Sequence, residues 1–313
     1  MNALSRGARE RIEAALGRAF GSASPITAFV PVGGGSISRV ARIDTAAGES
    51  AFLKWSAGDR SRAPEGIFAA EAAGLDLLRD AAELRVPAVF DCVDSVSDDR
   101  GPSTSPERWL LFEWLPPASP GRNGWIELGA RLARLHRSTR GEFGWERDNF
   151  IGSLPQRNRR MGSWPEFWRV CRLEPQLALA YDSHLVRDGA RRRFDALLAS
   201  LDDLLAAAAE DGPSLLHGDL WSGNVHFTGA GQPALIDPSV YYGHREVDLA
   251  MAELFGGFPE TFRRAYAEEW PLLPGFAERR PIYQLYYLLV HVNLFGAGYL
   301  ASTLSALAEA GFP

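Results

Sequence analysis

Along the chain, the spacing of apolar residues changes from the period of strands to the period of helices. Between about Ile26 and Leu115, four segments combine β-branched and aromatic residues as strands do, namely ITAFVPV, VARIDTA, AFLKWS and WLLFEWL. Helical spacing occurs in the first twenty residues and in PEGIFAAEAAGLDLLRDA, and it dominates from Trp125 on, beginning with WIELGARLARLH. Runs of strands followed by runs of helices predict an α+β protein.

The same change of pattern predicts where the chain divides. We expect an N-terminal lobe over residues 1–115 and a mostly helical C-terminal lobe over residues 116–313. The Pro- and Gly-rich stretch LPPASPGRNG separates the two patterns, and the hinge is expected near Trp114 to Pro120. The stretch SVSDDRGPSTSPER is predicted to form an exposed hairpin loop. The most hydrophobic segment, YQLYYLLVHVNLFGAGYL, contains Gln284, His291 and Asn293, so we expect a buried helix there rather than a membrane anchor.

Composition narrows the classes of function. The formal net charge of −6 argues against sequence-independent binding of nucleic acid, which depends on neutralising phosphates. The two cysteines, Cys92 and Cys171, give neither a metal-binding spacing nor a disulfide framework, so we expect a cytoplasmic protein. The first twenty residues lack the apolar core of a secretory signal. The oligomeric state is not determined by any of these features.

Candidate chemistry gathers in LLHGDLWSGNVHF and in the following ALIDPSVYYGHREVDLA. His217, Asp219, Leu220 and Asn224 fit H-x-D-L-x-x-x-N, the catalytic-loop pattern of kinases. In that chemistry the Asp accepts the proton of an attacking hydroxyl, and the Asn ligates a metal on the nucleotide phosphates. A second Asp on the next strand holds the metal that bridges the phosphates. Asp237, at the end of PALID, is placed for this last role.

The pattern therefore predicts Asp219 as the general base and Asn224 and Asp237 as ligands of Mg²⁺, which prefers hard oxygen donors. Pairing of VHF with ALI would bring these residues to one point. Each residue alone is also typical of a capped turn, and the complete spacing is what favours the catalytic interpretation. We expect His217 to be a core histidine, and the carboxylate of Asp248, at a helix start, to accept backbone N–H bonds from the loop.

A kinase also needs a loop that covers the phosphates of ATP. The stretch PVGGGSISRV lies between two predicted strands and matches the glycine-rich pattern at Gly33 and Gly35. Ser38 stands where the third glycine is expected, which reduces flexibility and offers a hydroxyl donor to phosphate. Ser36 lies in the same loop and completes the predicted phosphate-binding set.

Two further features of the predicted N-terminal lobe suit nucleotide binding. Lys54 in AFLKW matches the strand lysine that pairs with the α- and β-phosphates. A lysine in an apolar strand needs a partner, and Glu71 on the following helix is expected to supply it. At the end of LLFEWLP, the carbonyl of Glu113 and the N–H of Leu115 are placed to read adenine.

The motifs HGDLWSGN, GHREVDLA and FGWERDNFIGSLPQRN, with the LARLH helix, together resemble the fructosamine kinase (ketosamine-3-kinase) family. HGDxxxxN is shared with aminoglycoside phosphotransferases and with choline or homoserine kinases, whereas the segment Trp221–Gly223 and DNFIGSLPQ are similar to fructosamine kinases specifically. The resemblance implies a bilobal protein-kinase-like fold and ATP-dependent phosphorylation of the 3-hydroxyl of a small-molecule or protein-bound ketosamine. Such phosphorylated adducts are unstable and release the amine, which implies deglycation.

The chain departs from the protein-kinase pattern at two places, and from some members of the resembled family at a third. Gly218 replaces the arginine that reads activation-loop phosphorylation. Pro238 and Ser239, not Phe-Gly, follow Asp237, and the proline fixes the backbone there. Some fructosamine kinases carry a cysteine in the phosphate loop, whereas this loop has Ser36 and no cysteine, so redox control through the loop is not expected.

The acceptor side leaves alternatives open. Asn149 and Gln156 either hydrogen-bond sugar hydroxyls or cap a loop, and Trp221 forms either an apolar wall over the sugar or part of the packing. The arginines of LPQRNRRMG either form a rim that repels polycationic acceptors or belong to a solvated loop.

Two other functions compete with the ketosamine kinase. One is another small-molecule phosphotransferase, such as an aminoglycoside kinase, and the other is a nucleotide-binding pseudokinase. Retention of Lys54, Asp219, Asn224 and Asp237 argues against the pseudokinase, because a scaffold needs no catalytic base.

Overall fold

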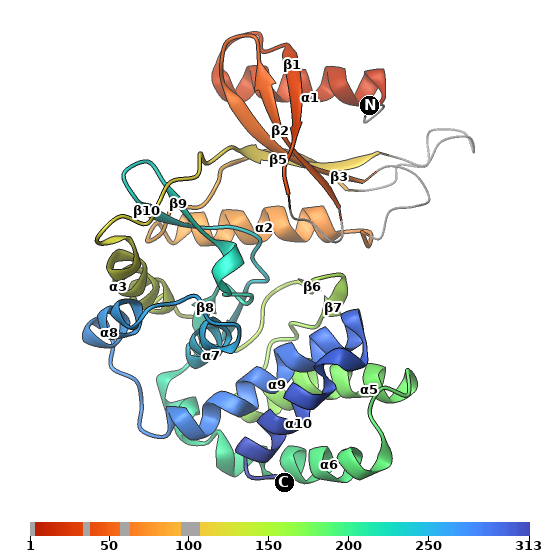
Figure 1. Ribbon diagram of the computed structural model, residues 1–313, viewed down its shortest axis with the longest axis vertical. Coiled ribbons are helices and arrows are strands. Elements are labelled where there is room, and N and C mark those ends of the chain that lie inside the picture. Colours follow the sequence, from red (N-terminus) through yellow and green to blue (C-terminus); the bar gives the residue numbers. More distant parts are fainter. Residues whose placement is uncertain (1–3, 34–37, 57–62, 95–106) are drawn as a thin grey trace. The chain divides into compact units, whose positions relative to one another are not determined.

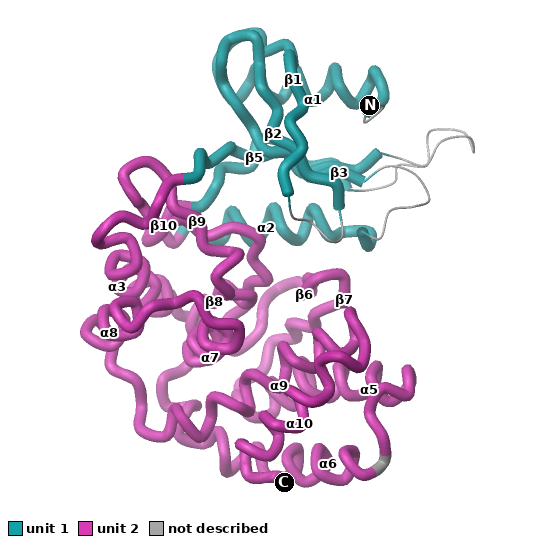
Figure 2. Tube along the Cα trace, in the orientation of Figure 1, with its two compact units in different colours: residues 1–80, 86–117 teal, residues 81–85, 118–313 magenta. Residues whose placement is uncertain are grey.

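The computed structural model describes residues 4–33, 38–56, 63–94 and 107–313 (Figure 1). The chain forms two compact units: unit 1 comprises residues 1–80 and 86–117, and unit 2 comprises residues 81–85 and 118–313 (Figure 2). Segment 81–85 belongs to unit 2, where the N–H of Leu235 donates to the carbonyl of Arg85 (2.9 Å). The lobe boundary between residues 115 and 116 stays a prediction. Gly35, Ser36 and most of SVSDDRGPSTSPER lie outside the described residues.

Unit 1 is built on a five-stranded antiparallel sheet with the strand order β1-β2-β3-β5-β4. Its strands are β1 (Ile26–Pro31), β2 (Arg39–Thr45), β3 (Ser50–Ser56), β4 (Val89–Val93) and β5 (Arg108–Glu113), and its helices are α1 (Arg6–Phe20) and α2 (Ile67–Asp80). The four predicted strands and both predicted helices are confirmed. The sequence did not predict β4, whose five residues include a charged one.

The helix α1 buries its apolar stripe against one face of this sheet. Ser5 caps its first turn, and Gly21 ends it in the left-handed conformation at φ 75°. Ile12 and Leu16 are buried in a core that also contains Leu53 of β3. Successive side chains of a strand point to opposite faces, so the residue after Leu53 is directed away from this core.

Unit 2 is mainly helical, with three short antiparallel strand pairs. Its helices are α3 (Gly124–His136), α4 (Trp164–Trp168), the π-helix η1 (Arg169–Leu173), α5 (Glu174–Asp182), α6 (Asp188–Leu204), the 3-10 turn η2 (Ala207–Asp211), the 3-10 turn η3 (Ser222–Asn224), α7 (Glu246–Leu254), α8 (Glu260–Glu269), α9 (Phe276–Phe295), the 3-10 turn η4 (Ala297–Tyr299) and α10 (Leu300–Glu309). The strand pairs are β6 (Asn149–Ile151) with β7 (Leu154–Gln156), β8 (Ser214–Leu216) with β11 (Tyr241–Gly243), and β9 (Val225–Thr228) with β10 (Gln232–Leu235).

Residues 283–295 of the most hydrophobic segment form most of α9, which packs against α5, α7 and α10 (Figure 1), and the last five residues of the segment form η4 and its two ends. Most residues of α9 from Ile282 to Val292 are buried, as the sequence predicted. Within the described residues, no helix combines the length and apolarity needed to cross a membrane.

Candidate active site

The hairpin of β9 and β10 brings two distant parts of the predicted site together. Val225 pairs with Leu235, so the residue before β9 and the residues after β10 meet at one end of the hairpin. The N–H of Ile236 donates to the carbonyl of Asn224 (3.1 Å) and extends this pairing by one step. The predicted pairing of VHF with ALI is confirmed, and it places Asp237 next to Asn224.

Asn224 links the two predicted acidic residues directly. Its Nδ2 donates to the backbone carbonyl of Asp219 (2.8 Å), to the Oδ2 of Asp219 (3.2 Å) and to the backbone carbonyl of Asp237 (3.5 Å). Because the two polar atoms of an amide diverge, these bonds direct the Oδ1 of Asn224 away from the loop backbone. The three predicted residues therefore converge, with an oxygen donor of Asn224 left to face a ligand.

The backbone of Asp237 is held in an uncommon conformation. Its φ is 54°, in the left-handed region, which asparagine and aspartate adopt more readily than other residues with a Cβ. Its side chain is exposed. Pro238 follows and restricts the backbone further. A carboxylate presented in this way is typical of a functional site, where strain is maintained by the surrounding fold.

Asp219 is partly exposed and lies in an environment that favours its neutral form. Burial raises the pKa of its carboxyl to about 7, and the nearby charges of Asp237 and Asp248 act in the same direction. The hydrogen bond from Asn224 opposes them. A carboxylate whose pKa lies near neutrality is well matched to accept a proton from a hydroxyl.

His217 is fully buried and connects the loop to the segment after β10. Its Nε2 donates to the carbonyl of Ile236 (2.9 Å), and its Nδ1 accepts from the N–H of Asp219 (3.3 Å). Burial lowers the pKa of the imidazole, and this bonding requires the neutral ring. The expectation of a core histidine agrees with these contacts.

Asp248, in the first turn of α7, supports the loop of His217 and Gly218 through hydrogen bonds, as the sequence predicted. Its carboxylate accepts the backbone N–H bonds of His217 (2.8 Å) and Gly218 (2.9 Å). The imidazole of His136, on α3, lies 3.2 Å from the same carboxylate. Gly218 has a φ of 82°, and a Cβ there would lie 2.0 Å from the carbonyl oxygen of Ser239, so no larger residue fits.

In unit 1, Lys54 and Glu71 form the predicted ion pair. The Nζ of Lys54 lies 2.7 Å from the Oε1 of Glu71, and only 10% and 14% of the two side chains are exposed. Lys54 follows Leu53, so it points away from α1 and toward α2, which carries Glu71. Buried charges of this kind occur in proteins almost only when they are paired.

The other predicted nucleotide-binding residues of unit 1 lie at strand ends. Gly33 follows β1 and Ser38 precedes β2, and these strands are paired. Glu113 ends β5, where its N–H donates to the carbonyl of Ala88 (2.8 Å), and Leu115 follows it and is buried. Their roles toward ATP stay predictions.

Asn149 and Gln156, which pair with each other at the open end of the β6–β7 hairpin, are almost fully buried. The Nδ2 of Asn149 donates to the carbonyl of Val240 (2.8 Å), and the Nε2 of Gln156 donates to the carbonyl of Ser239 (3.0 Å). The hydroxyl of Tyr286 donates to the Oε1 of Gln156 (2.7 Å). Because their polar atoms bond within the protein, these contacts favour the loop-supporting alternative over direct binding of a sugar.

Trp221 has 41% of its surface exposed. Its ring lies over Gly223, where a Cβ would come within 2.2 Å of a ring carbon. The glycine therefore permits the ring to lie flat on the loop, two residues from Asp219. This position suits an apolar wall beside the acceptor, which stays a prediction.

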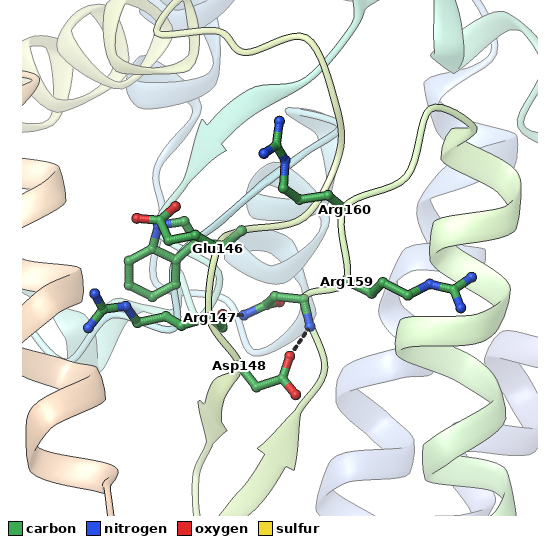
Figure 3. Close-up of a pocket in the computed structure, with 7 residues that line it drawn as sticks. Glu146, Arg147, Asp148, Arg159 and Arg160 are labelled. Carbon is green, nitrogen blue, oxygen red and sulfur yellow. Dashed lines mark hydrogen bonds between the residues drawn. The ribbon is translucent and has the colours of Figure 1, made fainter.

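Arg159 and Arg160, which follow β7, line an open hollow together with Trp145, Glu146, Arg147, Asp148 and Asn158 (Figure 3). The side chains of Arg147, Arg159 and Arg160 point in different directions rather than toward one point (Figure 3). Arg160 lies 2.7 Å from the carboxylate of Glu142 and Arg159 lies 4.0 Å from that of Glu166, and both arginines are exposed. These pairs weaken the electrostatic argument for a rim that repels cations.

Several supporting residues were not predicted from the sequence. The hydroxyl of Tyr266 lies 2.8 Å from the Nδ1 of His136, behind Asp248. Asn158, which lines the hollow, and Arg172 are both fully buried and bond to each other (2.8 Å). In the sequence, His136 stands at the end of LARLH and Asn158 at the end of QRN. Neither local pattern shows that the side chain is buried.

The sequence model of one protein family, described as fructosamine kinase, matches residues 8–310. A probable ketoamine kinase of Enterococcus faecium is 39% identical over 274 residues, covering 86% of this chain and 90% of that protein. A chloroplastic protein-ribulosamine 3-kinase of Arabidopsis thaliana is 36% identical over 290 residues, covering 92% of this chain and 83% of that protein.

Solved structures show similarity to the same family. A crystal structure from Thermobifida fusca, assigned as a fructosamine-3-kinase, has 34% identity and a TM-score of 0.81, with coverage of 96% of this chain and 98% of that one. The aminoglycoside phosphotransferase APH(4)-Ia has 17% identity and a TM-score of 0.57 over 96% and 99% of the two chains, which shows the fold alone. The predicted α+β, protein-kinase-like fold is confirmed.

Proposed function

The chain belongs to the fructosamine kinase family, and we propose on this basis that it transfers the γ-phosphoryl group of ATP to the 3-hydroxyl of a ketosamine. Relatives named as ketoamine kinase and as protein-ribulosamine 3-kinase cover most of its length at 36–39% identity. It is an ATP-dependent phosphotransferase with an alcohol group as acceptor. Because the phosphorylated ketosamine is unstable and releases the free amine, the reaction implies deglycation of small molecules or of proteins.

Asp219 is the proposed general base. Its carboxylate accepts the proton of the acceptor hydroxyl while the hydroxyl oxygen bonds to the γ-phosphorus and ADP departs. The backbone N–H of Asp219 is fixed by the neutral ring of His217, and the N–H groups before it are fixed by Asp248. These bonds orient the base without supplying a second proton acceptor.

The donor set of unit 2 fits Mg²⁺. The Oδ1 of Asn224 and the exposed carboxylate of Asp237 would hold the ion, both being hard oxygen donors. When bound, Mg²⁺ supplies neutralisation of the charge on the phosphates. Two protein oxygens cannot complete an octahedral shell, so we expect the ion to bind together with ATP.

The residues of unit 1 are proposed to hold ATP. Lys54, oriented by its ion pair with Glu71, would contact the α- and β-phosphates, while Gly33 and Ser38 flank the loop that covers them. Leu115, with the carbonyl of Glu113, would read adenine.

The observation that carries this proposal is the bonding of Asn224. One side-chain amide contacts both Asp219 and Asp237, so the residue types of the kinase pattern are joined as the chemistry requires. A capped turn does not require one amide to contact both Asp219 and Asp237, and membership of the family does not by itself require it.

The proposal is tested by turnover with a panel of acceptors. ADP release and ³¹P NMR of the product are measured with ribulosamine, erythrulosamine, fructosamine and kanamycin at equal concentration and fixed ionic strength. We expect a 3-phosphate of at least one ketosamine and little product from kanamycin. A higher kcat/KM for kanamycin would assign an antibiotic kinase, and ATP binding without turnover would assign a pseudokinase.

The cellular setting is also a proposal. A cytoplasmic location agrees with the low cysteine count of the chain. Protein-bound and free ketosamines are separated by comparing a glycated protein with its free lysine adduct in the same assay.

A further inference from the structure

Arg172 places a guanidinium inside unit 2. It lies in η1, the π-helical turn between α4 and α5, and its side chain is fully buried. Its Cζ lies 3.8 Å from the ring centroid of Tyr241 and 4.7 Å from that of Phe167. Among the residues that the structure describes, no carboxylate forms an ion pair with it. π-Helical turns inside α-helical segments are frequently found at functional sites.

A buried charge without a counter-ion is costly and needs a compensating role. The Nη1 of Arg172 donates to the carbonyls of Arg157 (2.5 Å) and Cys171 (3.0 Å), and its Nη2 donates to the Oδ1 of Asn158 (2.8 Å). These dipoles and the ring faces stabilise the charge without neutralising it. A well-packed apolar side chain would fill the same space at lower cost, so the fixed fork of donors is the property that this position uses.

The bond to Asn158 begins a chain of buried side-chain amides. The Nδ2 of Asn158 donates to the Oδ1 of Asn149 (2.8 Å), which also accepts from the Nε2 of Gln156 (2.8 Å). The chain ends on the backbone carbonyls of Val240, bonded to Asn149, and Ser239, bonded to Gln156. Because guanidinium can only donate, it fixes the oxygen of Asn158 toward itself and its nitrogen toward Asn149.

This chain ends where the two acidic segments of the site meet. The N–H of Ser239 donates to the carbonyl of His217 (2.9 Å), and the carbonyl of Ser239 lies against Gly218. His217 and Gly218 directly precede Asp219, and Ser239 follows Asp237 by two residues. A displacement of Ser239 would therefore move the backbone of both acidic residues relative to each other.

We infer that Arg172 is a positioning residue for phosphoryl transfer, which holds residues 239–240 against the catalytic loop through Asn158, Asn149 and Gln156. It thereby sets the placement of Asp219 relative to Asp237. This role rests on the proposed phosphoryl transfer. A misplacement of about 1 Å in a catalytic group can cost roughly 10²-fold in rate, so a distant arginine can control turnover without contacting substrate.

The experiment compares Arg172→Met with Arg169→Met, a control on the same π-helical turn. Arg169 donates to the carbonyl of Leu198 and pairs with Asp202, away from the amide chain. We expect Arg172→Met to lower kcat by about 10- to 100-fold with KM for ATP changed less than about two-fold. Arg169→Met is expected to keep kcat within about two-fold. Arg172→Lys keeps the charge but not the fork, so it is expected to recover only part of kcat.

A second readout needs no turnover. In the nucleotide-free protein, amide hydrogen exchange of Ser239 is expected to accelerate in Arg172→Met and to stay unchanged in Arg169→Met, because the bond to His217 is loosened only in the former. If wild-type protein phosphorylates no ketosamine, the proposed function fails. In that case the exchange comparison still decides whether Arg172 holds this segment.

Asn158→Asp is a second variant that tests the inference if Arg172→Met does not fold. Its carboxylate would pair with Arg172 and maintain stability, yet it would replace the donor to Asn149 by an acceptor and so break the chain. We expect normal thermal stability with kcat lowered about ten-fold or more. The inference is overturned if Arg172→Met and Asn158→Asp both keep kcat within two-fold of wild type with unchanged exchange at Ser239.

Discussion

The two units hold their polar residues in different ways. In unit 1, Lys54 lies on a regular strand and is oriented by an ion pair with Glu71 on the neighbouring helix. In unit 2, Asp219 lies on an irregular loop that Asp248, His217 and Asn224 support through several hydrogen bonds. A strand needs little help to aim a side chain, whereas a loop must be fixed by its surroundings.

The backbone shows the same contrast. Unit 2 keeps Asp237 at φ 54° and Gly218 at φ 82°, conformations that its hydrogen bonds must maintain. The difference suggests separate tasks: the pair of unit 1 is expected to govern affinity for ATP, and the network of unit 2 is expected to govern the chemical step.

The largest effect is expected from Asp219→Asn, which removes the base and keeps the shape of the side chain. Turnover should fall by about 10²–10⁴, because positioned base catalysis contributes that much. The Kd for ATP, measured by calorimetry, should stay near the wild-type value. Asp203→Asn, on the exposed face of α6, is the matched control. Near-native turnover of Asp219→Asn would remove this residue from the role.

The next effect is expected from Asp237, the proposed metal ligand. Asp237→Ala should lower kcat by about 10²–10³ or more, since it removes a group that stabilises developing charge. Asp237→Asn is the control that removes the negative charge and keeps the backbone conformation, because asparagine also tolerates a positive φ. It distinguishes loss of the charge from a change in the backbone. Calorimetry should detect Mg²⁺ binding only when ATP is present. Tight binding of Mg²⁺ by the nucleotide-free protein would contradict this picture.

A smaller effect, on another kinetic constant, is expected in unit 1. Lys54→Met and Glu71→Gln should each lower kcat/KM for ATP by about 10- to 100-fold, mainly through KM, because each removes one half of a buried ion pair. The double variant tests the pair, and its loss should be clearly smaller than the product of the single losses. Additive effects, or a loss confined to kcat, would break the division of tasks between the units.

The smallest effect is expected at Trp221, on the exposed side of the loop. Trp221→Ala should lower kcat/KM for the ketosamine by about 3- to 10-fold, since an aromatic contact contributes on the order of 0.5–1.5 kcal/mol. Trp221→Phe should retain most of the value, and KM for ATP should not change. Equal constants for the Ala variant and wild type would assign the ring to packing alone.

Much of this protein was predictable from the sequence, because the signals are local. Strand and helix periods gave four strands of unit 1 and the helices α1, α2, α3 and α9. The spacing of Asp219, Asn224 and Asp237 was sufficient to predict the hairpin that joins them, since register follows from two short apolar runs and the turn between them. Glu71 lies 17 positions after Lys54, on the next predicted helix. The two could be paired from the sequence because a lysine in an apolar strand needs a partner of opposite charge.

Only the tertiary structure decided the remainder. The strand β4 was missed because Asp91 interrupts its apolar pattern, and that carboxylate accepts the Nε1–H of Trp109 from the adjacent strand (2.9 Å). From the sequence, Asn149 and Gln156 could equally be ligands of a sugar or residues that support a loop.

Their partners, Val240 and Ser239, lie 91 and 83 positions away, and no local pattern predicts that distance. The buried guanidinium of Arg172 is one arginine among many in the sequence. Whether a polar side chain faces water or a partner depends on which distant segments pack over it, because a buried polar group is stable only where its hydrogen bonds are satisfied. Local sequence fixes the elements and the order of catalytic residues, and packing fixes which polar groups support them.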